Sequence, residues 1–287
     1  MTILGSTQPG PTPSPTGSEV AVVTPSPTTT PTASPTASPS DTPVPSSSGT
    51  PAPTGSPPKV ITATATGKDP HGIWSVRVRY PQLAAPDLPM AATVNQDVAA
   101  DIQAQIQAFE VGPAADQQEP GKVNTLNCSY TVALIRPDLA SFILTWVDDT
   151  SGAHPSTTIE TINYDLTQGT RLAFGDVFSD TTAATAILSQ QSRDLLHAVL
   201  GADYDPVVVN SGTVPDCPSS SGATASCPVS TGSNFGTWAL TKNGLEVIFQ
   251  EYQVGAYADG HPSVVVPWSA LAGVLKADGP GAHLAGA

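Results

Sequence analysis

The chain has 287 residues, with 10 Lys and Arg against 24 Asp and Glu, which gives a formal net charge of −14 at pH 7. This excess of acidic side chains argues against nucleic acids and anionic membrane surfaces as partners, and it favours a basic protein. No run of eighteen apolar residues occurs, so the sequence predicts no membrane-spanning helix.

The first 58 residues have the composition of a disordered stalk. Pro, Thr and Ser account for 39 of them, and Phe, Tyr, Trp and Cys are absent. Such a segment buries too little apolar surface to offset its ordering entropy, and its proline spacing favours an extended chain. Because the stalk begins close to residue 1, we expect a signal or anchor sequence upstream, and any membrane attachment would depend on it.

The composition changes at residue 59, and all 16 aromatic residues lie between residues 60 and 276. We therefore expect a folded region over 59–276, either as one domain or as two packed halves, 59–148 and 149–276, followed by a flexible tail over 277–287. Residues 59–287 contain all ten Lys and Arg and 22 of the 24 acidic residues, which gives this part a net charge of −12.

The first predicted elements are a strand and a helix. Residues 73–80 alternate, with Trp74, Val76, Val78 and Tyr80 on one face. Pro89 then opens a helix that ends at Gly112-Pro113. Its apolar side chains recur at helical spacing: Met90, Val94, Val98, Ile102, Ile106 and Phe109.

An antiparallel meander is predicted next. Strands at 126–135 and 139–147 are joined by the turn Arg136-Pro137-Asp138, and a third strand spans 157–166. Thr181 or Thr182 caps a second helix that runs to Leu200 and stops at Gly201. The apolar stripe of this helix is Ile187, Leu188, Leu195, Leu196 and Val199.

A long loop over 203–234 precedes the last predicted elements. Strands at 237–241 and 245–252 flank Asn243-Gly244, a strong hairpin signal. A strand at 263–267 and a short helix at 268–275 follow. The order of elements does not alternate strand and helix, so it predicts an α+β fold with antiparallel sheets, two main packed helices and a short closing helix.

The three cysteines are Cys128, Cys217 and Cys227. The last two bracket a Ser- and Gly-rich loop, which favours a local disulfide over a metal site. Two alternatives remain open: all three are reduced, or Cys128 pairs with one of the other two.

No common catalytic, nucleotide-binding or metal-binding motif occurs in the sequence. The five histidines, at 71, 154, 197, 261 and 283, do not have metal-ligand spacing. The sequence therefore predicts no catalytic residue, metal or cofactor.

Two segments resemble a known family. One is Gly152-Ala153-His154-Pro155 with the strand that follows it. The other runs from Leu240 through Tyr252 and Tyr257-Ala258-Asp259-Gly260 to Val266-Pro267-Trp268-Ser269-Ala270-Leu271. Together they are similar to the RsiV-type extracellular domains (DUF4163/DUF3298-like), which include lysozyme-binding ectodomains of anti-sigma factors, secreted mycobacterial immunogenic proteins and the N-terminal part of a peptidoglycan deacetylase.

This resemblance implies a non-enzymatic binding or sensing domain in the bacterial cell envelope, either secreted or membrane-anchored. The partner it implies is a basic protein such as lysozyme, or a cell-wall glycan. We take Tyr252, Tyr257, His154 and His261 as candidate ligand contacts. The alternatives are an enzyme acting on glycans or esters whose site is assembled only by the fold, and a structural envelope protein.

Overall fold

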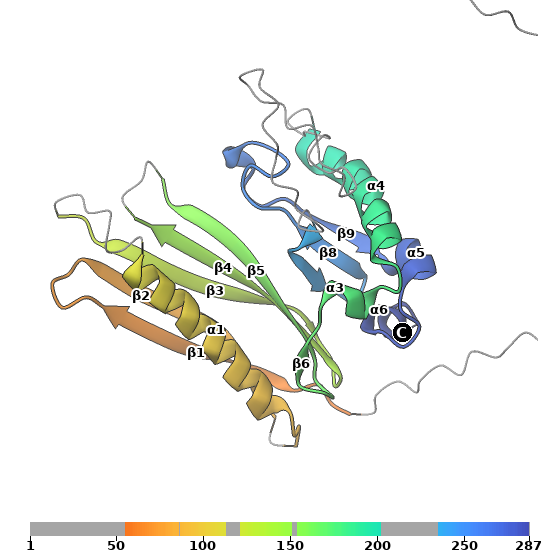
Figure 1. The fold of residues 1–287 in the computed structure, drawn as a ribbon, viewed down its shortest axis with the longest axis horizontal. Helices are drawn as coiled ribbons and strands as arrows, with labels where there is room; N and C mark the ends of the chain where they lie inside the picture. Colours follow the sequence, from red (N-terminus) through yellow and green to blue (C-terminus); the bar gives the residue numbers. More distant parts are fainter. Residues whose placement is uncertain (1–54, 86, 113–120, 151–153, 202–234, 287) are drawn as a thin grey trace, which may run out of the picture. The chain divides into compact units, whose positions relative to one another are not determined.

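The computed structural model describes residues 55–85, 87–112, 121–150, 154–201 and 235–286. They form two sheets with packed helices, which confirms the predicted α+β class (Figure 1). Residues 1–54 of the expected stalk, and residues 203–234 with Cys217 and Cys227, lie outside the described residues. Within the described ranges, no helix is long and apolar enough to cross a membrane.

The first sheet has six strands in chain order. They are β1 (Lys59–Lys68), β2 (Trp74–Ala84), β3 (Asn124–Ile135), β4 (Leu139–Asp149), β5 (Ser156–Asp165) and β6 (Thr170–Arg171). β4 and β5 pair from Leu139 and Asp165 to Asp148 and Ser156. The expected boundary between residues 148 and 149 therefore falls within a hairpin of one sheet and does not separate two halves.

One strand pair departs from the expected antiparallel pattern. β2 and β3 are parallel, with Trp74 beside Asn124 and Val78 beside Cys128. The helix α1 (Ala91–Val111) connects them. A helical connection returns the chain to the starting end of the sheet, so the next strand runs in the same direction.

α1 lies across one side of this sheet, as Figure 1 shows. Its predicted stripe is confirmed, because Val94, Val98, Ile102, Ile106 and Phe109 are each at most 8% exposed. Each such side chain contributes roughly 1.5–3 kcal/mol by leaving water. Met90 lies just before the helix and is half-buried.

β1 was not predicted, although it pairs with β2 over ten residues. It is an edge strand of Thr, Ala and Gly residues with only two large apolar side chains, Val60 and Ile61. None of its residues is fully buried, so its alternation between exposed and half-buried positions leaves little hydrophobic signal in the sequence.

The second sheet contains β7 (Trp238–Leu240), β8 (Gly244–Ile248) and β9 (Ser263–Pro267), all antiparallel. The hairpin at Asn243-Gly244 is confirmed, but Gly244 is a strand residue without a positive φ. It is needed because β9 passes so closely: a Cβ on Gly244 would lie 2.1 Å from the carbonyl oxygen of Val266.

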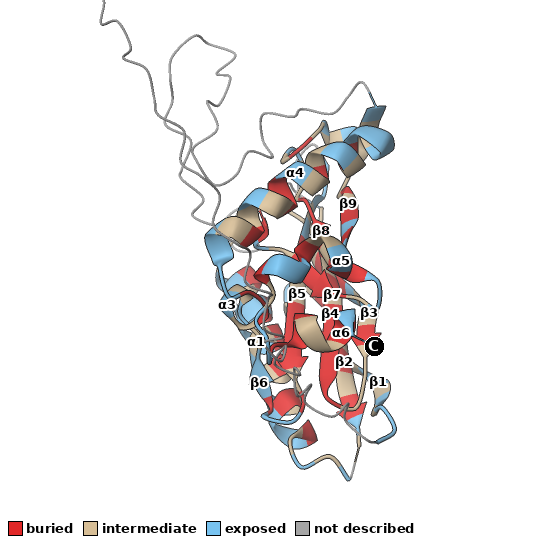
Figure 2. Ribbon diagram, turned by 90° about the vertical axis from the view of Figure 1, so that its right-hand side faces the viewer, coloured by how far each residue is buried: buried red, intermediate tan, exposed pale blue. Residues whose placement is uncertain are grey.

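α3 (Phe174–Val177) and α4 (Thr181–Leu200) follow the first sheet, and α4 packs on β9. Asp180 caps α4 by accepting a hydrogen bond from the Ala183 amide, so the predicted Thr181 or Thr182 cap was wrong. Leu188 and Leu196 are buried, whereas Val199 of the predicted stripe is 60% exposed. Figure 2 shows exposed residues along the outward side of α4 and buried residues on the strands.

The chain closes with α5 (Trp268–Leu271), the 3₁₀ turn η5 (Ala272–Val274) and α6 (Pro280–Ala285). Part of the expected tail is thus a helix. Leu284 is 5% exposed and belongs to the core around the second sheet, and Gly281 is buried against Leu275. The tail prediction failed because one leucine among glycines and alanines produces no helical pattern.

A buried polar cluster joins the two sheets. Asn163 on β5 accepts a hydrogen bond from the Ser141 hydroxyl at 2.6 Å and donates to the Trp238 carbonyl at 2.9 Å. The Leu240 amide donates to Ser141 Oγ at 3.0 Å and to Asn163 Oδ1 at 3.3 Å. Ser141 is fully buried and Asn163 is 5% exposed. These bonds connect β4 and β5 directly to β7.

Candidate functional site

Three of the four predicted ligand contacts form an aromatic cluster, defined here as His154, Tyr252 and Tyr257. The His154 and Tyr257 rings stack with centroids 4.0 Å apart and an interplanar angle of 29°. The Tyr252 ring lies 5.7 Å from that of Tyr257 at 32°. His154 precedes β5 and the tyrosines follow β8, so the fold brings together segments about 100 residues apart in the chain.

Polar atoms of His154 and Tyr257 bond to the backbone beside β5. The Tyr257 hydroxyl donates to the Pro155 carbonyl at 3.1 Å, and His154 Nδ1 donates to the same oxygen at 3.2 Å. His261, the fourth candidate, is half-buried, and its Nε2 donates to the Thr157 carbonyl at 3.3 Å. Because the Tyr257 hydroxyl and His154 Nδ1 bond to the backbone, these two residues offer mainly their ring faces to a ligand.

The loop that carries the tyrosines is held against β5. The Gln250 side chain forms two hydrogen bonds with the Ile159 backbone. Its Nε2 donates to the Ile159 carbonyl at 2.7 Å, and the Ile159 backbone N–H donates to its Oε1 at 3.1 Å. Asp259 accepts from the Ala256 amide at 2.7 Å and closes the short 3₁₀ helix η4 (Tyr257–Asp259). These bonds fix the tyrosines before a ligand arrives, which reduces the entropy lost on binding.

Tyr252 has an unusual backbone conformation. Its φ is 62°, and among the described residues it alone has a positive φ without being glycine. Its side chain is 64% exposed. A bulky residue in this region is strained, and such strain tends to occur at functional sites. The ring is thus held in solvent at a cost in backbone energy.

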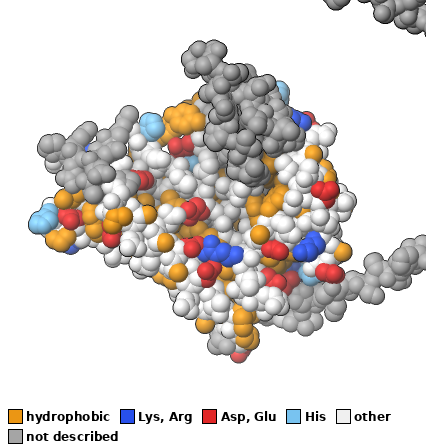
Figure 3. Space-filling model, viewed as in Figure 1, with side chains coloured by type: hydrophobic (Ala, Val, Ile, Leu, Met, Phe, Trp, Pro, Cys, Tyr) orange, Lys and Arg blue, Asp and Glu red, His pale blue; other side chains and the backbone are white. Residues whose placement is uncertain are grey.

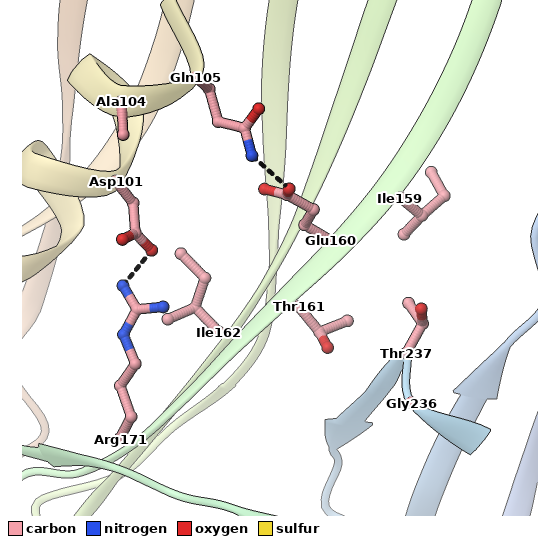
Figure 4. Close-up of a pocket in the computed structure, with 10 residues that line it drawn as sticks. All are labelled: Asp101, Ala104, Gln105, Ile159, Glu160, Thr161, Ile162, Arg171, Gly236 and Thr237. Atoms are coloured by element: carbon pink, nitrogen blue, oxygen red, sulfur yellow. Dashed lines mark hydrogen bonds and ion pairs between the residues drawn. The ribbon is translucent and has the colours of Figure 1, made fainter. Parts of the chain in front are cut away.

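A second candidate is a polar pocket between α1, β5, Arg171 and the start of β7, with a volume of about 350 Å³ (Figure 4). It is lined by Asp101, Ala104, Gln105, Ile159, Glu160, Thr161, Ile162, Arg171, Gly236 and Thr237. Figure 4 shows Asp101 and Arg171 turned toward each other at one side and Gln105 turned toward Glu160 at the other.

Arg171 forms an ion-pair network with α1. Its Nε lies 2.6 Å from Asp97, and its Nη2 pairs with Asp101. The Tyr164 hydroxyl also donates to Asp97. This hydrogen bond, with help from Arg171 and against the effect of burial, lowers the pKa of Asp97. On the face seen in Figure 3, Lys and Arg side chains lie next to acidic ones.

Glu160 is the most chemically distinctive residue of the pocket. Burial raises the pKa of its carboxyl group, partly offset by the hydrogen bond from the Trp146 indole. Its two oxygens accept from Gln105 Nε2 at 2.8 Å and from Trp146 Nε1 at 2.9 Å. Both oxygens therefore already have donors, which suits a residue that ties α1 to the sheet.

Sequence reasoning missed the pocket residues. Asp97 and Asp101 are four residues apart and share a face of α1, which is visible in the sequence. Arg171 is 70 residues beyond Asp101 and lies in a two-residue strand, so nothing in the sequence links it to α1. Within the described residues, no group of three or more His, Cys, Asp or Glu side chains could hold a metal ion.

Of the three cysteines, the structure describes only Cys128. Cys128 forms no disulfide and is 5% exposed, and burial raises the pKa of its thiol to about 12. The predicted Cys217–Cys227 disulfide lies outside the described residues and stays a prediction.

Comparisons with known proteins support the family resemblance. Residues 223–269 match the family described as "Protein of unknown function (DUF3298)". The chain is 26% identical over 161 residues to the peptidoglycan-N-acetylmuramic acid deacetylase PdaC of Bacillus subtilis (strain 168). That alignment covers 56% of this chain and 31% of the deacetylase, so it spans about a third of the longer protein.

Two solved structures share the fold. A DUF3298 family protein (PA4972) from Pseudomonas aeruginosa PAO1 matches with a TM-score of 0.52 at 17% identity, over 78% of this chain and 96% of that one. A DUF3298 family member (BF2082) from Bacteroides fragilis NCTC 9343 matches with a TM-score of 0.52 at 16% identity, over 80% and 97%. The resemblance drawn from the sequence is confirmed at the level of the family. The family match includes both tyrosines of the aromatic cluster but not His154.

Proposed function

We propose that this chain is a non-enzymatic binding domain of the bacterial cell envelope that holds a basic protein, such as a lysozyme, at the aromatic cluster. The observation that carries the proposal is the aromatic cluster, in which His154 stacks on Tyr257 and Tyr252 lies beside them, with the His154 and Tyr252 side chains exposed. Similarity to a deacetylase named for peptidoglycan supports the envelope location, since it places a related segment in a protein of cell-wall chemistry.

The charge of the chain supports a basic ligand. Residues 59–287 carry a net charge of −12, which attracts a cationic protein over long range at low salt. Lys and Arg side chains of the ligand can then stack on the tyrosine faces. A cation over an aromatic ring contributes about 0.5–2 kcal/mol, depending on how far it is desolvated.

The experiment is calorimetric titration of the full chain with a purified basic lysozyme at low salt. Tyr257→Ala should raise Kd at least tenfold, mainly through faster dissociation, as expected for a fixed aromatic anchor. Tyr257→Phe should have a smaller effect, because it keeps the ring and loses only the hydrogen bond to Pro155. Ile61→Ala serves as a control, because it truncates an exposed apolar side chain on β1, which three strands of the first sheet separate from β5.

Two results would count against this proposal. Absence of saturable binding at low salt would remove the basic-protein ligand. If Tyr257→Ala leaves Kd unchanged, the ligand does not bind at the aromatic cluster. A parallel titration uses soluble peptidoglycan fragments, because sugar rings also stack on tyrosine. If the chain binds these fragments and does not bind lysozyme, the ligand is the cell-wall glycan.

The polar pocket supports a second candidate function, an enzyme that acts on glycans. The observation in its favour is a partly buried carboxyl group, Glu160, with a raised pKa beside Asp101 in a cavity. Against it, both Glu160 oxygens accept hydrogen bonds from protein donors. Turnover of acetylated or plain glycan that disappears in Glu160→Gln, while lysozyme binding persists, would favour the enzyme.

A further inference from the structure

The side of the first sheet opposite α1 carries basic and hydroxyl side chains at its β1–β2–β3 end. In β2 the buried Val76 and Val78 alternate with the exposed Arg77 and Arg79, so both arginines lie on this side. Strand register places Thr66 and Asn127 on either side of Arg77. We call Lys68, Arg77 and Arg79, with the neighbouring Thr66, Thr125 and Asn127, the basic sheet face.

The cations of this face are not neutralised within the described residues. Lys68, Arg77 and Arg79 form none of the ion pairs found there. Two neighbouring acids are engaged elsewhere: Asp149, opposite Thr125 in the sheet, pairs with Lys122 at 3.6 Å, and Asp69, next to Lys68 in the chain, accepts from the His71 amide at 2.6 Å. Unpaired positive charge on a chain of net charge −14 indicates an anionic ligand.

The surface is hollowed as well as basic. One depression of about 650 Å³ is lined by five of the six residues of the basic sheet face, all but Arg79. A second, of about 230 Å³, is lined by Thr62, Arg79, Ser129, Tyr130 and Val132. No acidic side chain lines either one, and both are rich in hydroxyl groups.

These features fit one kind of ligand. Arginine presents a planar fork of donors that matches a phosphate group, and the two arginines lie about 7 Å apart along the strand. The Thr hydroxyls and the Asn127 amide can bind the hydroxyl groups between successive anions. We propose that the basic sheet face binds a linear polyol-phosphate polymer, with Arg77 and Arg79 on consecutive phosphates.

The net negative charge of the chain does not prevent this contact. At physiological ionic strength the Debye length is about 8 Å, so distant carboxylates are largely screened and the local arginines decide the interaction. The basic sheet face shares no residue with the aromatic cluster, so this inference does not rest on the proposed function.

The test is calorimetric titration of the full chain with soluble poly(glycerol phosphate). Arg77→Gln with Arg79→Gln should weaken binding by about tenfold or more, because each arginine makes charge-assisted hydrogen bonds. Lys242→Gln with Lys276→Gln removes the same charge from exposed positions elsewhere and should change Kd less than about twofold. The slope of log K against log salt should fall by about two in the arginine variant.

A gain-of-function variant keeps the test independent of any folding defect. Thr64 is exposed beside Arg79 on the same side, so Thr64→Lys should tighten binding. Three results would overturn the proposal: no saturable binding, equal weakening in the arginine and lysine pairs, or binding of single-stranded DNA or a polyuronate as tight as that of the polyol phosphate.

Discussion

Replacing Asn163 by Ala tests whether the buried polar cluster holds the two sheets together. The change leaves the Ser141 hydroxyl without its acceptor and removes the donor to the Trp238 carbonyl. Each buried polar group left unsatisfied costs about 1–3 kcal/mol, and the lost side-chain volume adds to this. We expect a loss of about 3–5 kcal/mol in the free energy of unfolding, or roughly 6–20 °C in Tm for a folded region of this size.

Urea denaturation followed by tryptophan fluorescence measures this loss, and Asn127→Ala is the matched control. Asn127 lies on the same sheet but is exposed, with one side-chain hydrogen bond at 3.3 Å to Thr125, so its replacement should cost less than about 0.5 kcal/mol. A double-mutant cycle with Ser141→Ala should show coupling of at least about 0.5 kcal/mol. Equal effects of the two Asn variants, or no coupling, would refute the role of the cluster.

Four further outcomes are expected. Tyr252→Gly should be more stable than Tyr252→Ala by about 1 kcal/mol in denaturation, because only glycine adopts the positive φ without strain. Gly244→Ala should cost about 3 kcal/mol in the same assay, because its Cβ would meet the Val266 carbonyl. The depressed pKa of Asp97 stabilises the fold above its unfolded pKa of about 4, so the stability gap between the wild type and Asp97→Asn should close as pH falls below that value. Cys128 should resist thiol reagents at pH 8 until the protein unfolds, as mass spectrometry would detect, because its thiol is buried and has a raised pKa.

Local patterns predicted most helices and strands because each depends on its own residues. The alternation in β2, the stripe of α1 and the meander of β3, β4 and β5 all match the structure. The elements that were not predicted, β1 and α6, depend on contacts with distant parts of the chain. β1 is held by its pairing with β2, and α6 by packing against the core around the second sheet. The parallel β2–β3 pair follows from how α1 packs, which periodicity does not encode.

The candidate site was likewise predicted only in part. Family resemblance placed His154, Tyr252 and Tyr257 among the candidates, and the structure stacks the first and last of these rings and places Tyr252 beside them. Neither the positive φ of Tyr252 nor the role of Gln250 in holding the loop could be read from residue types. The alternation in β2 already placed Arg77 and Arg79 on one face, but the residues that complete the polar pocket and the basic sheet face come from strands whose pairing the sequence did not reveal.

The core around the second sheet sets the smallest fragment that can be studied alone. The family match spans residues 223–269, which include β7, β8 and β9. Those strands bury their apolar side chains against Leu188 and Leu196 of α4 and Leu284 of α6, all outside that span. An excised 223–269 peptide would expose this surface and aggregate, so the span of the family match is narrower than the unit that folds.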